Sequence, residues 1–600
     1  MLALGACAHL PSAARGESSA DAWADSVLAT LTPRERAAQL VWPQLFGDYT
    51  AEGSASWQRI SNWVANERIG GFVMSIGSPV ETAVKLNALQ GMARVPILVG
   101  ADYEDGAGFR TRGGHFLPNA IYLGGATVFP KQMALGAAGD TALAYAQGRI
   151  TAIEGRAVGV HMAFAPVLDV NNNPNNPVIG PRSFGEDPAV VSRMGVALIR
   201  GLQENGMLAT AKHFPGHGDT DRNSHLSITE VNASRPRLDS VELVPFRRAI
   251  ASGVAAVMTF HGVVPALDTT PVPATLSPVV MNGLLRRDMG FDGLLITDAL
   301  DMNGVLARVR PAANATPLTG NYGTIDSPGL AEVVKLAVIA GNDVLLMPLD
   351  VPTAIDAVVN GVREGRFTQA RVDASARRIL RMKRQLGLHR DRFVDVDSVR
   401  SRVGTSANLA AADTAAQRAI TLAKDSLQLV PLASTAGKPN VLSITIANRV
   451  DLGAGTTFDA ELRNGANVRS LWVDPTDPLN ALARAAALAD SVESVVIGAY
   501  LAQGTTVANA NAPDAVSAFI RAVHERKPRT ILVAFGNPYL LQNVPFVSSY
   551  VVAWGGFPPS QRAAARALIG ASDITGRLPI SIPPLLRLGA GDSRRARITR

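Results

Sequence analysis

The densest group of residues able to do chemistry lies between Lys212 and His225. Three of the nine histidines fall within this stretch, which reads Lys-His-Phe-Pro-Gly-His-Gly-Asp-Thr-Asp-Arg-Asn-Ser-His. Its proline and two glycines exclude a helix and predict a shaped loop that leaves a strand. Histidine and aspartate side chains in such a loop could bind a metal ion or transfer a proton.

A metal site in this loop would use His213, His217, His225 and Asp219. These residues lack a regular ligand spacing and no second metal-binding segment accompanies them, so no metal ion is expected. The alternative is a polar, sugar-binding strand end at Lys212 and His213. A mobile loop would then deliver His225 as a proton carrier.

Polar residues also end other apolar runs of the chain. Asp102, Asp169, His261 and Asp298 each close such a run, as the Lys-His pair does. Any one of them could be an ordinary helix N-cap. Five strand ends on one face favour an active site, because a (β/α)8 barrel carries its active site at the carboxyl ends of its strands.

Eight short apolar runs separated by helix-like segments indicate repeated βαβ units. The runs are residues 39–46, 71–75, 96–102, 162–169, 208–213, 255–260, 293–298 and 343–347. Eight alternating strands fit a TIM-type (β/α)8 barrel better than a doubly wound sheet. We therefore predict an α/β protein with a barrel at residues 31–390.

A second βαβ series follows a polar linker, predicted at residues 391–418. Its apolar runs are residues 441–447, 468–473, 495–500, 530–535 and 550–554. They predict a smaller α/β (αβα) sandwich domain at 419–600, which could form one wall of the site or only stabilise the barrel. No Gly-x-Gly-x-x-Gly follows the first strand of either series, so no dinucleotide or other cofactor is expected.

Composition excludes several classes of protein. Of the 600 residues, 47% are hydrophobic and 18% charged, which excludes a disordered chain and allows a large core. The formal charge of +7 is small for this length, and without a reading motif it predicts no nucleic-acid partner. The chain has no stretch of 18 apolar residues, so no membrane span is expected.

The single cysteine, Cys7, excludes a disulfide framework and a Cys-based zinc site. Apolar residues precede it and a small-residue segment follows, which resembles the end of a bacterial lipoprotein signal whose Cys is lipidated after cleavage. The charged part of such a signal is missing, so the start would lie upstream. We therefore expect residues 1–30 to be a signal remnant and linker. The protein would be exported, periplasmic or membrane-anchored through Cys7, with a cytoplasmic location as the alternative.

The loop at 212–225 is similar to the signature of bacterial β-N-acetylhexosaminidases of glycoside hydrolase family 3. Further motifs agree in order: Arg-Ser-Phe-Gly-Glu-Asp-Pro from Arg182, Pro-Ala-Thr-Leu-Ser-Pro from Pro273, Thr-Asp-Ala-Leu-Asp-Met from Thr297 and Ile-Thr-Gly-Arg-Leu-Pro from Ile574. The resemblance covers residues 31 to 583. It implies a retaining exo-β-N-acetylglucosaminidase that acts on peptidoglycan-derived muropeptides.

Carried over by position, the resemblance implies that Asp298 is the nucleophile and His225 the general acid/base. The sugar-contacting positions of the family match Asp102, Arg110, Arg182, Lys212 and His213. The family segment Asp-x-Glu-Gly-Gly is here Asp-Tyr-Glu-Asp-Gly, so Asp105 replaces a glycine.

These roles agree with the chemistry of the side chains. Retaining hydrolysis needs a carboxylate about 5 Å from a proton donor. We expect the cationic Lys212 to keep the Asp298 carboxylate ionised. A neutral imidazole can deprotonate water, or phosphate, without an anionic base repelling the incoming nucleophile, and the sequence leaves the choice of acceptor open.

One departure concerns the partner of His225. The family loop has Asp-x-His, whereas this chain has Asn223-Ser224-His225. An asparagine can accept a hydrogen bond from the ring but adds no charge to stabilise the imidazolium. Either Asp221 or Asp219 takes the orienting role, or catalysis is weakened, or the protein is a non-catalytic muropeptide-binding lipoprotein. A family 3 β-glucosidase or β-xylosidase is a further alternative, although those enzymes lack the histidine loop.

Overall fold

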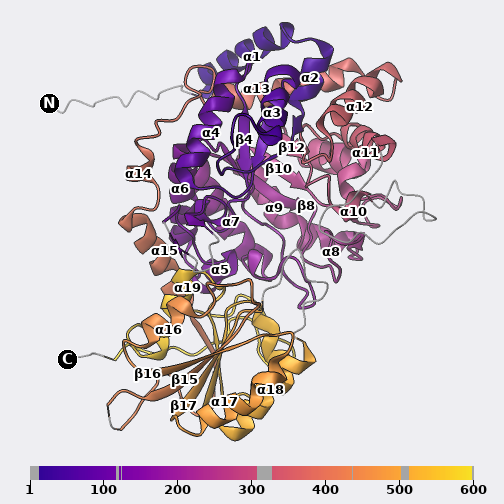
Figure 1. The fold of residues 1–600 in the computed structure, drawn as a ribbon. Coiled ribbons are helices and arrows are strands. Elements are labelled where there is room, and N and C mark those ends of the chain that lie inside the picture. Colours follow the sequence, from indigo (N-terminus) through magenta and orange to yellow (C-terminus); the bar gives the residue numbers. More distant parts are fainter. Residues whose placement is uncertain are drawn as a thin grey trace, which may run out of the picture.

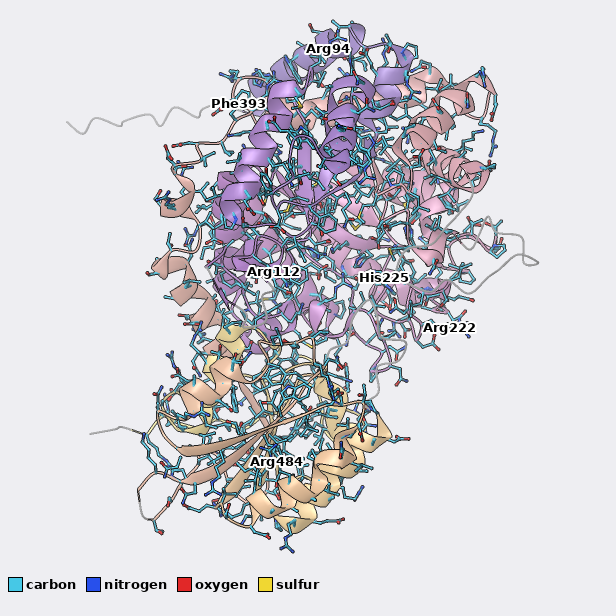
Figure 2. The ribbon with its side chains drawn as sticks, viewed as in Figure 1. Arg94, Arg112, Arg222, His225, Phe393 and Arg484 are labelled. Atoms are coloured by element: carbon cyan, nitrogen blue, oxygen red, sulfur yellow. The ribbon has the colours of Figure 1, made fainter. Side chains whose placement is uncertain are left out.

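The computed structural model describes residues 13–115, 121–122, 124–306, 327–435, 437–501 and 513–597, so Cys7 lies outside the described residues. The chain forms a large barrel followed by a smaller sheet domain at one end of it (Figure 1). Figure 2 shows Arg94 and Phe393 at the end of the barrel remote from the second domain, and His225 in the half nearest to it. The loop that carries His225 therefore faces the second domain.

The barrel is a ring of parallel strands. Its strands are β1 (Val41–Trp42), β2 (Gln44–Leu45), β3 (Gly71–Met74), β4 (Leu98–Ala101), β7 (Met162–Ala163), β8 (Leu208–Phe214), β10 (Ala256–Thr259), β12 (Leu294–Ile296) and β13 (Leu345–Leu346). The sheet runs in the order β12-β10-β8-β7-β4-β3-β2, and β1 pairs with β13. A parallel bridge between Ile296 and Val344 joins the two sheets and closes the ring. The predicted (β/α)8 barrel is confirmed.

The first predicted strand, 39–46, is in fact two short strands separated by Pro43. Residues 41–42 pair with β13 on one side, whereas residues 44–45 pair with β3 on the other. Proline has no N–H to donate, so the ladder is interrupted there. The carbonyl of Pro43 still accepts from the Val73 N–H at 2.9 Å, and this single segment connects both edges of the sheet.

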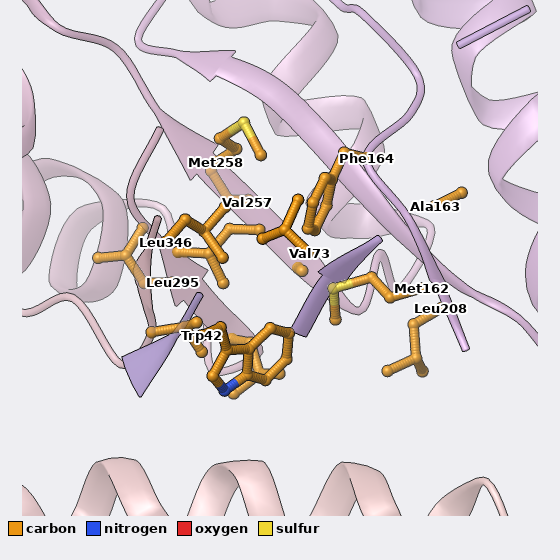
Figure 3. Close-up of a cluster of buried hydrophobic side chains, with 14 of the residues drawn as sticks. Trp42, Val73, Met162, Ala163, Phe164, Leu208, Val257, Met258, Leu295 and Leu346 are labelled. Atoms are coloured by element: carbon orange, nitrogen blue, oxygen red, sulfur yellow. The ribbon is translucent and has the colours of Figure 1, made fainter. Parts of the chain in front are cut away.

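Large apolar side chains fill the barrel interior. Figure 3 shows Trp42, Val73, Phe164, Met258 and Leu295 gathered there, and none of these side chains is more than 5% exposed. Strands buried on both faces explain why the sequence has continuous apolar runs instead of alternation.

A helix follows each barrel strand and covers the outside of the ring. These are α3 (Ala55–Asn62), α4 (Pro79–Met92), α6 (Thr141–Ala157), α7 (Pro188–Gln203), α9 (Leu243–Ala251), the π-helix η5 (Val279–Asp288), α11 (Ser327–Ala340) and α12 (Val351–Arg363). α7 begins at a typical cap, where the Asp187 side chain accepts from the Ala189 N–H and Pro188 takes the first helical position. At the end remote from the second domain lie α1 (Ala13–Ala29), α2 (Pro33–Gln39) and α13 (Gln369–Gln385) (Figure 1).

The second domain is a six-stranded sheet between two helical layers. Its strands are β14 (Thr421–Asp425), β15 (Asn440–Ile446), β16 (Asn467–Val473), β17 (Ser494–Ala499), β18 (Thr530–Ala534) and β19 (Ser549–Val552), in the order β14-β19-β18-β17-β15-β16. α17 (Leu482–Ala489) and α18 (Asp514–Arg526) pack on one face, and α16 (Thr456–Leu462) and α19 (Pro558–Leu568) on the other. The sequence predicted β15 to β19 but missed β14, a mixed-polarity edge strand antiparallel to β19.

The two domains share a packed interface. Met133, Ala134 and Ala137 of α5 (Gln132–Ala138) belong to the apolar core of the second domain. The Glu186 carboxylate accepts from the backbone N–H and hydroxyl of Ser581, at 2.8 and 2.9 Å. These contacts fix the second domain over the carboxyl ends of the barrel strands.

Candidate active site

A cavity of about 590 Å³ lies at the carboxyl ends of the barrel strands and is lined by both domains. The barrel contributes Asp102, Glu104, Arg110, Arg182, Lys212, His213, His225, Asp298 and Asp301, among others. The second domain contributes Asp451, Tyr500, Phe535, Gly536, Gly555, Gly556 and Phe557. Of the strand-end residues that the sequence singled out, Asp102, Lys212, His213 and Asp298 line the cavity, whereas Asp169 and His261 do not. The second domain forms part of the cavity wall.

Asp298 lies just after β12 and is half-buried. Its Oδ1 accepts a hydrogen bond from the Ala299 N–H at 2.8 Å. Burial alone would raise its pKa, but the imidazoles of His213, His261 and His225 outweigh that effect and lower the pKa to about 2. The carboxylate is therefore ionised at neutral pH and can act as a nucleophile.

The expected source of this stabilisation, Lys212, instead contacts other carboxylates. Its buried ammonium lies 2.7 Å from Glu104 Oε1 and 3.2 Å from Asp102 Oδ1. The groups that lower the pKa of Asp298 are the three imidazoles. A strand-end lysine can reach several acidic neighbours, and the sequence alone does not show which one it contacts.

Glu104 is a functional residue that the sequence analysis did not select. Its buried carboxylate accepts from two nitrogens of the Arg182 guanidinium, Nη2 at 2.7 Å and Nε at 2.9 Å, and also contacts the ammonium of Lys212. Burial opposes ionisation, but the charges of Arg182 and Lys212 keep its pKa well below the usual range. The sequence did contain a signal for Glu104, because this residue follows the strand-end Asp102 by two positions. It holds in place two cations predicted to contact the sugar.

Asp169 and His213 form a buried pair beside these cations. His213 Nδ1 lies 2.7 Å from Asp169 Oδ2, and the backbone N–H of His217 donates to Asp169 Oδ1 at 2.7 Å. Arg182 Nη2 lies 3.4 Å from His213 Nε2. A ring held from both sides presents one fixed face to the cavity.

The loop places Asn223 against the ring of His225. The Asn223 Oδ1 accepts from the backbone N–H of His225 at 2.9 Å and lies 3.1 Å from its Nδ1. Because only the amide oxygen can accept from that backbone N–H, Nδ1 of the neutral ring is the donor and Nε2 keeps its lone pair.

The expectation that Asp221 or Asp219 orients His225 is corrected by this arrangement. Asn223 is 3% exposed, whereas Asp221 is exposed. Asp219 is half-buried, and its charge adds to the effect of burial in raising the pKa of Glu242. Burial lowers the pKa of His225 to about 4, although the Asp298 carboxylate acts in the opposite direction. The imidazole is therefore neutral at neutral pH.

Two further histidines, His217 within the loop and His261 outside it, are fixed by hydrogen bonds. His217 lies 2.9 Å from the hydroxyl of Thr220 and 3.0 Å from that of Ser224. His261, after β10, lies 2.8 Å from the Thr275 hydroxyl and 2.9 Å from the Ala299 carbonyl. Among the residues that the structure describes, no group of three or more His, Cys, Asp and Glu is placed to hold a metal ion.

Asp301 is a second carboxyl group at the site that the sequence analysis missed. It lines the cavity three residues after Asp298 and is 8% exposed. Burial and the charge of Asp298 raise its pKa to about 7. At acidic pH it is a neutral hydrogen-bond donor next to the ionised Asp298.

No helix in the described part of the chain is long and apolar enough to cross a membrane.

Comparison with known proteins identifies the family of the barrel. Residues 32–382 match the model of the glycosyl hydrolase family 3 N-terminal domain. A β-N-acetylglucosaminidase/β-glucosidase of Cellulomonas fimi is 29% identical over 85% of this chain and 88% of its own length. A β-hexosaminidase A of Pseudoalteromonas piscicida is 32% identical over 57% of each chain.

A solved structure gives the same result for the whole fold. A glycoside hydrolase family 3 β-N-acetylglucosaminidase from Paenibacillus sp. FPU-7 superposes with a TM-score of 0.78 at 31% identity. The superposition covers 92% of this chain and 99% of that one. The similarity therefore includes both the barrel and the second domain.

Proposed function

The chain belongs to glycoside hydrolase family 3 and is a β-N-acetylhexosaminidase, and on this premise we propose that it removes terminal β-linked N-acetylglucosamine from peptidoglycan-derived muropeptides with retention of configuration. The observation that carries the proposal is the pairing, in one cavity, of an ionised Asp298 with a neutral His225. The first step of a double displacement needs the ionised carboxylate as nucleophile, and the second step needs the neutral imidazole as base.

The proposed reaction has two steps. Asp298 attacks C1 of the sugar while protonated His225 gives its proton to the departing glycosidic oxygen, so one C–O bond forms as the other breaks. Neutral His225 then takes a proton from the acceptor, whose oxygen attacks C1 and releases Asp298. Asn223 holds the ring with Nε2 as the base.

The sugar hydroxyls would be held by the polar cluster between Asp102 and His213. The buried Lys212 and the half-buried Arg182 are cations held in place by Glu104, and Arg110 Nη2 donates to Asp102 Oδ2 at 2.7 Å. Preorganised charged donors of this kind bind hydroxyl groups without having to rearrange during the reaction. Muropeptides are proposed as the substrates because the histidine loop resembles that of the bacterial enzymes.

Two chromogenic substrates test the activity. Hydrolysis of 4-nitrophenyl β-N-acetylglucosaminide, but not of the β-glucoside, supports the proposal. Preference for the glucoside would favour a β-glucosidase, an activity that the name of the Cellulomonas fimi relative includes. Binding of muropeptides without turnover of either substrate would favour a binding protein. A higher kcat/KM on N-acetylglucosaminyl–muramyl disaccharides than on chitobiose would support the substrate class.

The nucleophile is identified by trapping the covalent intermediate. A 5-fluoro sugar that keeps the 2-acetamido group should label Asp298, and peptide mapping by mass spectrometry should locate the label. Asp298→Asn is the matched control and should remain unlabelled. Label on Asp301, the neighbouring carboxyl group in the cavity, would contradict the assignment.

We also propose that the protein resides in the cell envelope as a lipoprotein. This proposal is based on the sequence around Cys7 alone. Metabolic labelling with a palmitate analogue, compared between the full chain and Cys7→Ser, tests it. Equal labelling of the two proteins would exclude attachment at Cys7.

A further inference from the structure

A cluster of one cation and two aromatic rings joins the domains at the edge of the cavity. Lys131 Nζ lies 4.9 Å from the ring centre of Phe109 and 5.2 Å from that of Phe557. The two rings meet edge to face with centres 6.4 Å apart. Phe109 and Lys131 belong to the barrel and Phe557 to the second domain, and we call these three residues the interdomain cap.

The Lys131 side chain of the interdomain cap is held by an ion pair and a close backbone neighbour. The Lys131 ammonium forms an ion pair of 2.5 Å with Asp105, whose side chain is fully buried. Gly555 lies so close that an added Cβ would be 3.4 Å from Lys131 Cγ. Asp105 is the residue that replaces a family glycine, so this departure supplies the counter-ion of the cap.

The strand order places the cap opposite the nucleophile. β4, which precedes Asp102, and β12, which precedes Asp298, are four strands apart in the sheet order β12-β10-β8-β7-β4. In a ring of eight strands they are therefore diametrically opposed. Arg110 donates to Asp102 at 2.7 Å, and its guanidinium lies 4.9 Å from the ring centre of Phe109. The cap thus adjoins the Asp102 side of the cavity.

This position determines which end of a sugar chain meets the cap. C1 and C4 lie on opposite sides of a pyranose ring. With C1 at Asp298, as the proposed function requires, O4 points toward Asp102 and the cap. In this orientation a further sugar on O4 would run into the Phe557 ring and the Lys131 stem, which line the cavity.

We propose that the interdomain cap limits the cavity to a single sugar on the non-reducing side of the cleaved bond, and that Phe557 is its specificity-determining residue. The second domain would thereby make the enzyme exo-acting. This inference rests on the proposed function, since it takes Asp298 as the group that attacks C1.

The test uses the 4-nitrophenyl β-glycoside of N,N′-diacetylchitobiose. An exo enzyme first removes the terminal N-acetylglucosamine, so nitrophenol appears only after a lag. In Phe557→Ala the disaccharide should enter as a unit, which releases nitrophenol directly together with intact chitobiose. We expect the disaccharide share of the first products to rise at least about tenfold, the scale of discrimination set by a pocket wall.

Two further variants separate the cap from general damage. Phe557→Trp keeps an aromatic ring in place and should keep the wild-type product pattern. Phe546→Ala removes a ring that packs on Arg521 at 4.1 Å, in the same domain and outside the residues that line the cavity, and should also keep it.

The outcomes distinguish this inference from the proposed function. If the wild-type enzyme cleaves N-acetylglucosaminides but Phe557→Ala retains the lag and yields no chitobiose, the cap does not set specificity. If Phe557→Ala only raises KM for substrates with large leaving groups, the wall belongs to the leaving-group side and the inference is also overturned. An inactive wild-type enzyme would instead contradict the proposed function.

Discussion

At the scale of single residues, the protonation of His225 depends on a neutral partner. Asn223 accepts from the ring and fixes its orientation, but an amide adds no negative charge beside the imidazole. Burial then determines the outcome and lowers the pKa of His225 to about 4. The base needed for the second step is present at neutral pH, whereas the acid needed for the first step is scarce.

Asn223→Asp should therefore raise the pKa of His225, because an opposite charge within about 4–6 Å favours the protonated ring. For disaccharides with poor leaving groups, the basic limb of the plot of kcat/KM against pH should shift to higher pH. The rate at neutral pH should increase. Nitrophenyl substrates should change less, since their leaving group needs no proton. Asp221→Asn is the control, because Asp221 is exposed. An unchanged limb in Asn223→Asp, or a large loss in Asp221→Asn, would show that Asn223 is not the partner.

Asp301 should make the stability of the enzyme depend on pH. Its pKa is raised to about 7 from the ordinary aspartate value of 3.8, so the folded state binds more protons than the unfolded state between these values. The contribution of Asp301 to the free energy of unfolding is fully present below its pKa in the unfolded state, and it is lost as pH rises through 7. In Asp301→Asn this loss, about 2–4 kcal/mol for a shift of this size, should disappear. Urea unfolding at pH 5 and pH 8 measures it, and an equal difference in wild type and variant would contradict the prediction.

At the scale of elements, most of the barrel could be predicted from the sequence because its strands are buried on both faces. The apolar runs that correspond to β3, β4, β8, β10 and β12 could be recognised from their composition and from the turn residues that flank them. The division at Pro43 and the edge strand β14 could not be predicted, because each depends on which neighbour is available for pairing.

Contacts within the site were less predictable than the site itself. The sequence placed Asn223 and Asp221 two residues apart on a loop without periodicity, so it could not show which side chain turns inward. The same limit applies to Lys212, which contacts Glu104 and Asp102. Residue types and strand ends predict which groups meet, but the hydrogen-bond pattern is set by tertiary packing.

The helix α13 contains a buried lysine at the end of the barrel remote from the active site. Lys383 is fully buried, and its ammonium donates to Gln39 Oε1 at 2.7 Å. Burial lowers its pKa to about 7, so the unfolded state binds more protons between pH 7 and the unfolded value near 10.5. The free energy of unfolding should therefore rise with pH across this window. Lys383→Met should abolish this slope, which denaturant titrations at pH 7 and pH 10 would show. Lys438→Met, at an exposed lysine, should keep the wild-type slope, and a slope that persists in Lys383→Met would exclude Lys383 as its source.

At the scale of the whole molecule, the cavity joins the two domains in one functional unit. Met133, Ala134 and Ala137 of α5 lie in the core of the second domain, and Phe557 and Tyr500 line the cavity from that domain. A ligand bound in the cavity contacts both domains, so its binding free energy should stabilise both against unfolding.

Calorimetry of the full chain tests this coupling. A competitive inhibitor derived from N-acetylglucosamine, at about 100 times its Kd, should add about 2.7 kcal/mol to the stability of whatever unfolds with the site. If the domains are coupled, calorimetry should show either one unfolding transition that the inhibitor moves to higher temperature, or two transitions that both move to higher temperature. Glu186→Ala removes both hydrogen bonds that the half-buried Ser581 donates to this charged acceptor across the interface, at a cost of about 1–3 kcal/mol. In this variant the second domain should unfold at lower temperature and the KM should rise, because the Phe557 wall is less firmly held. Inhibitor that shifts only the barrel transition in the wild type, or a KM unaffected by Glu186→Ala, would show that the second domain does not share the site.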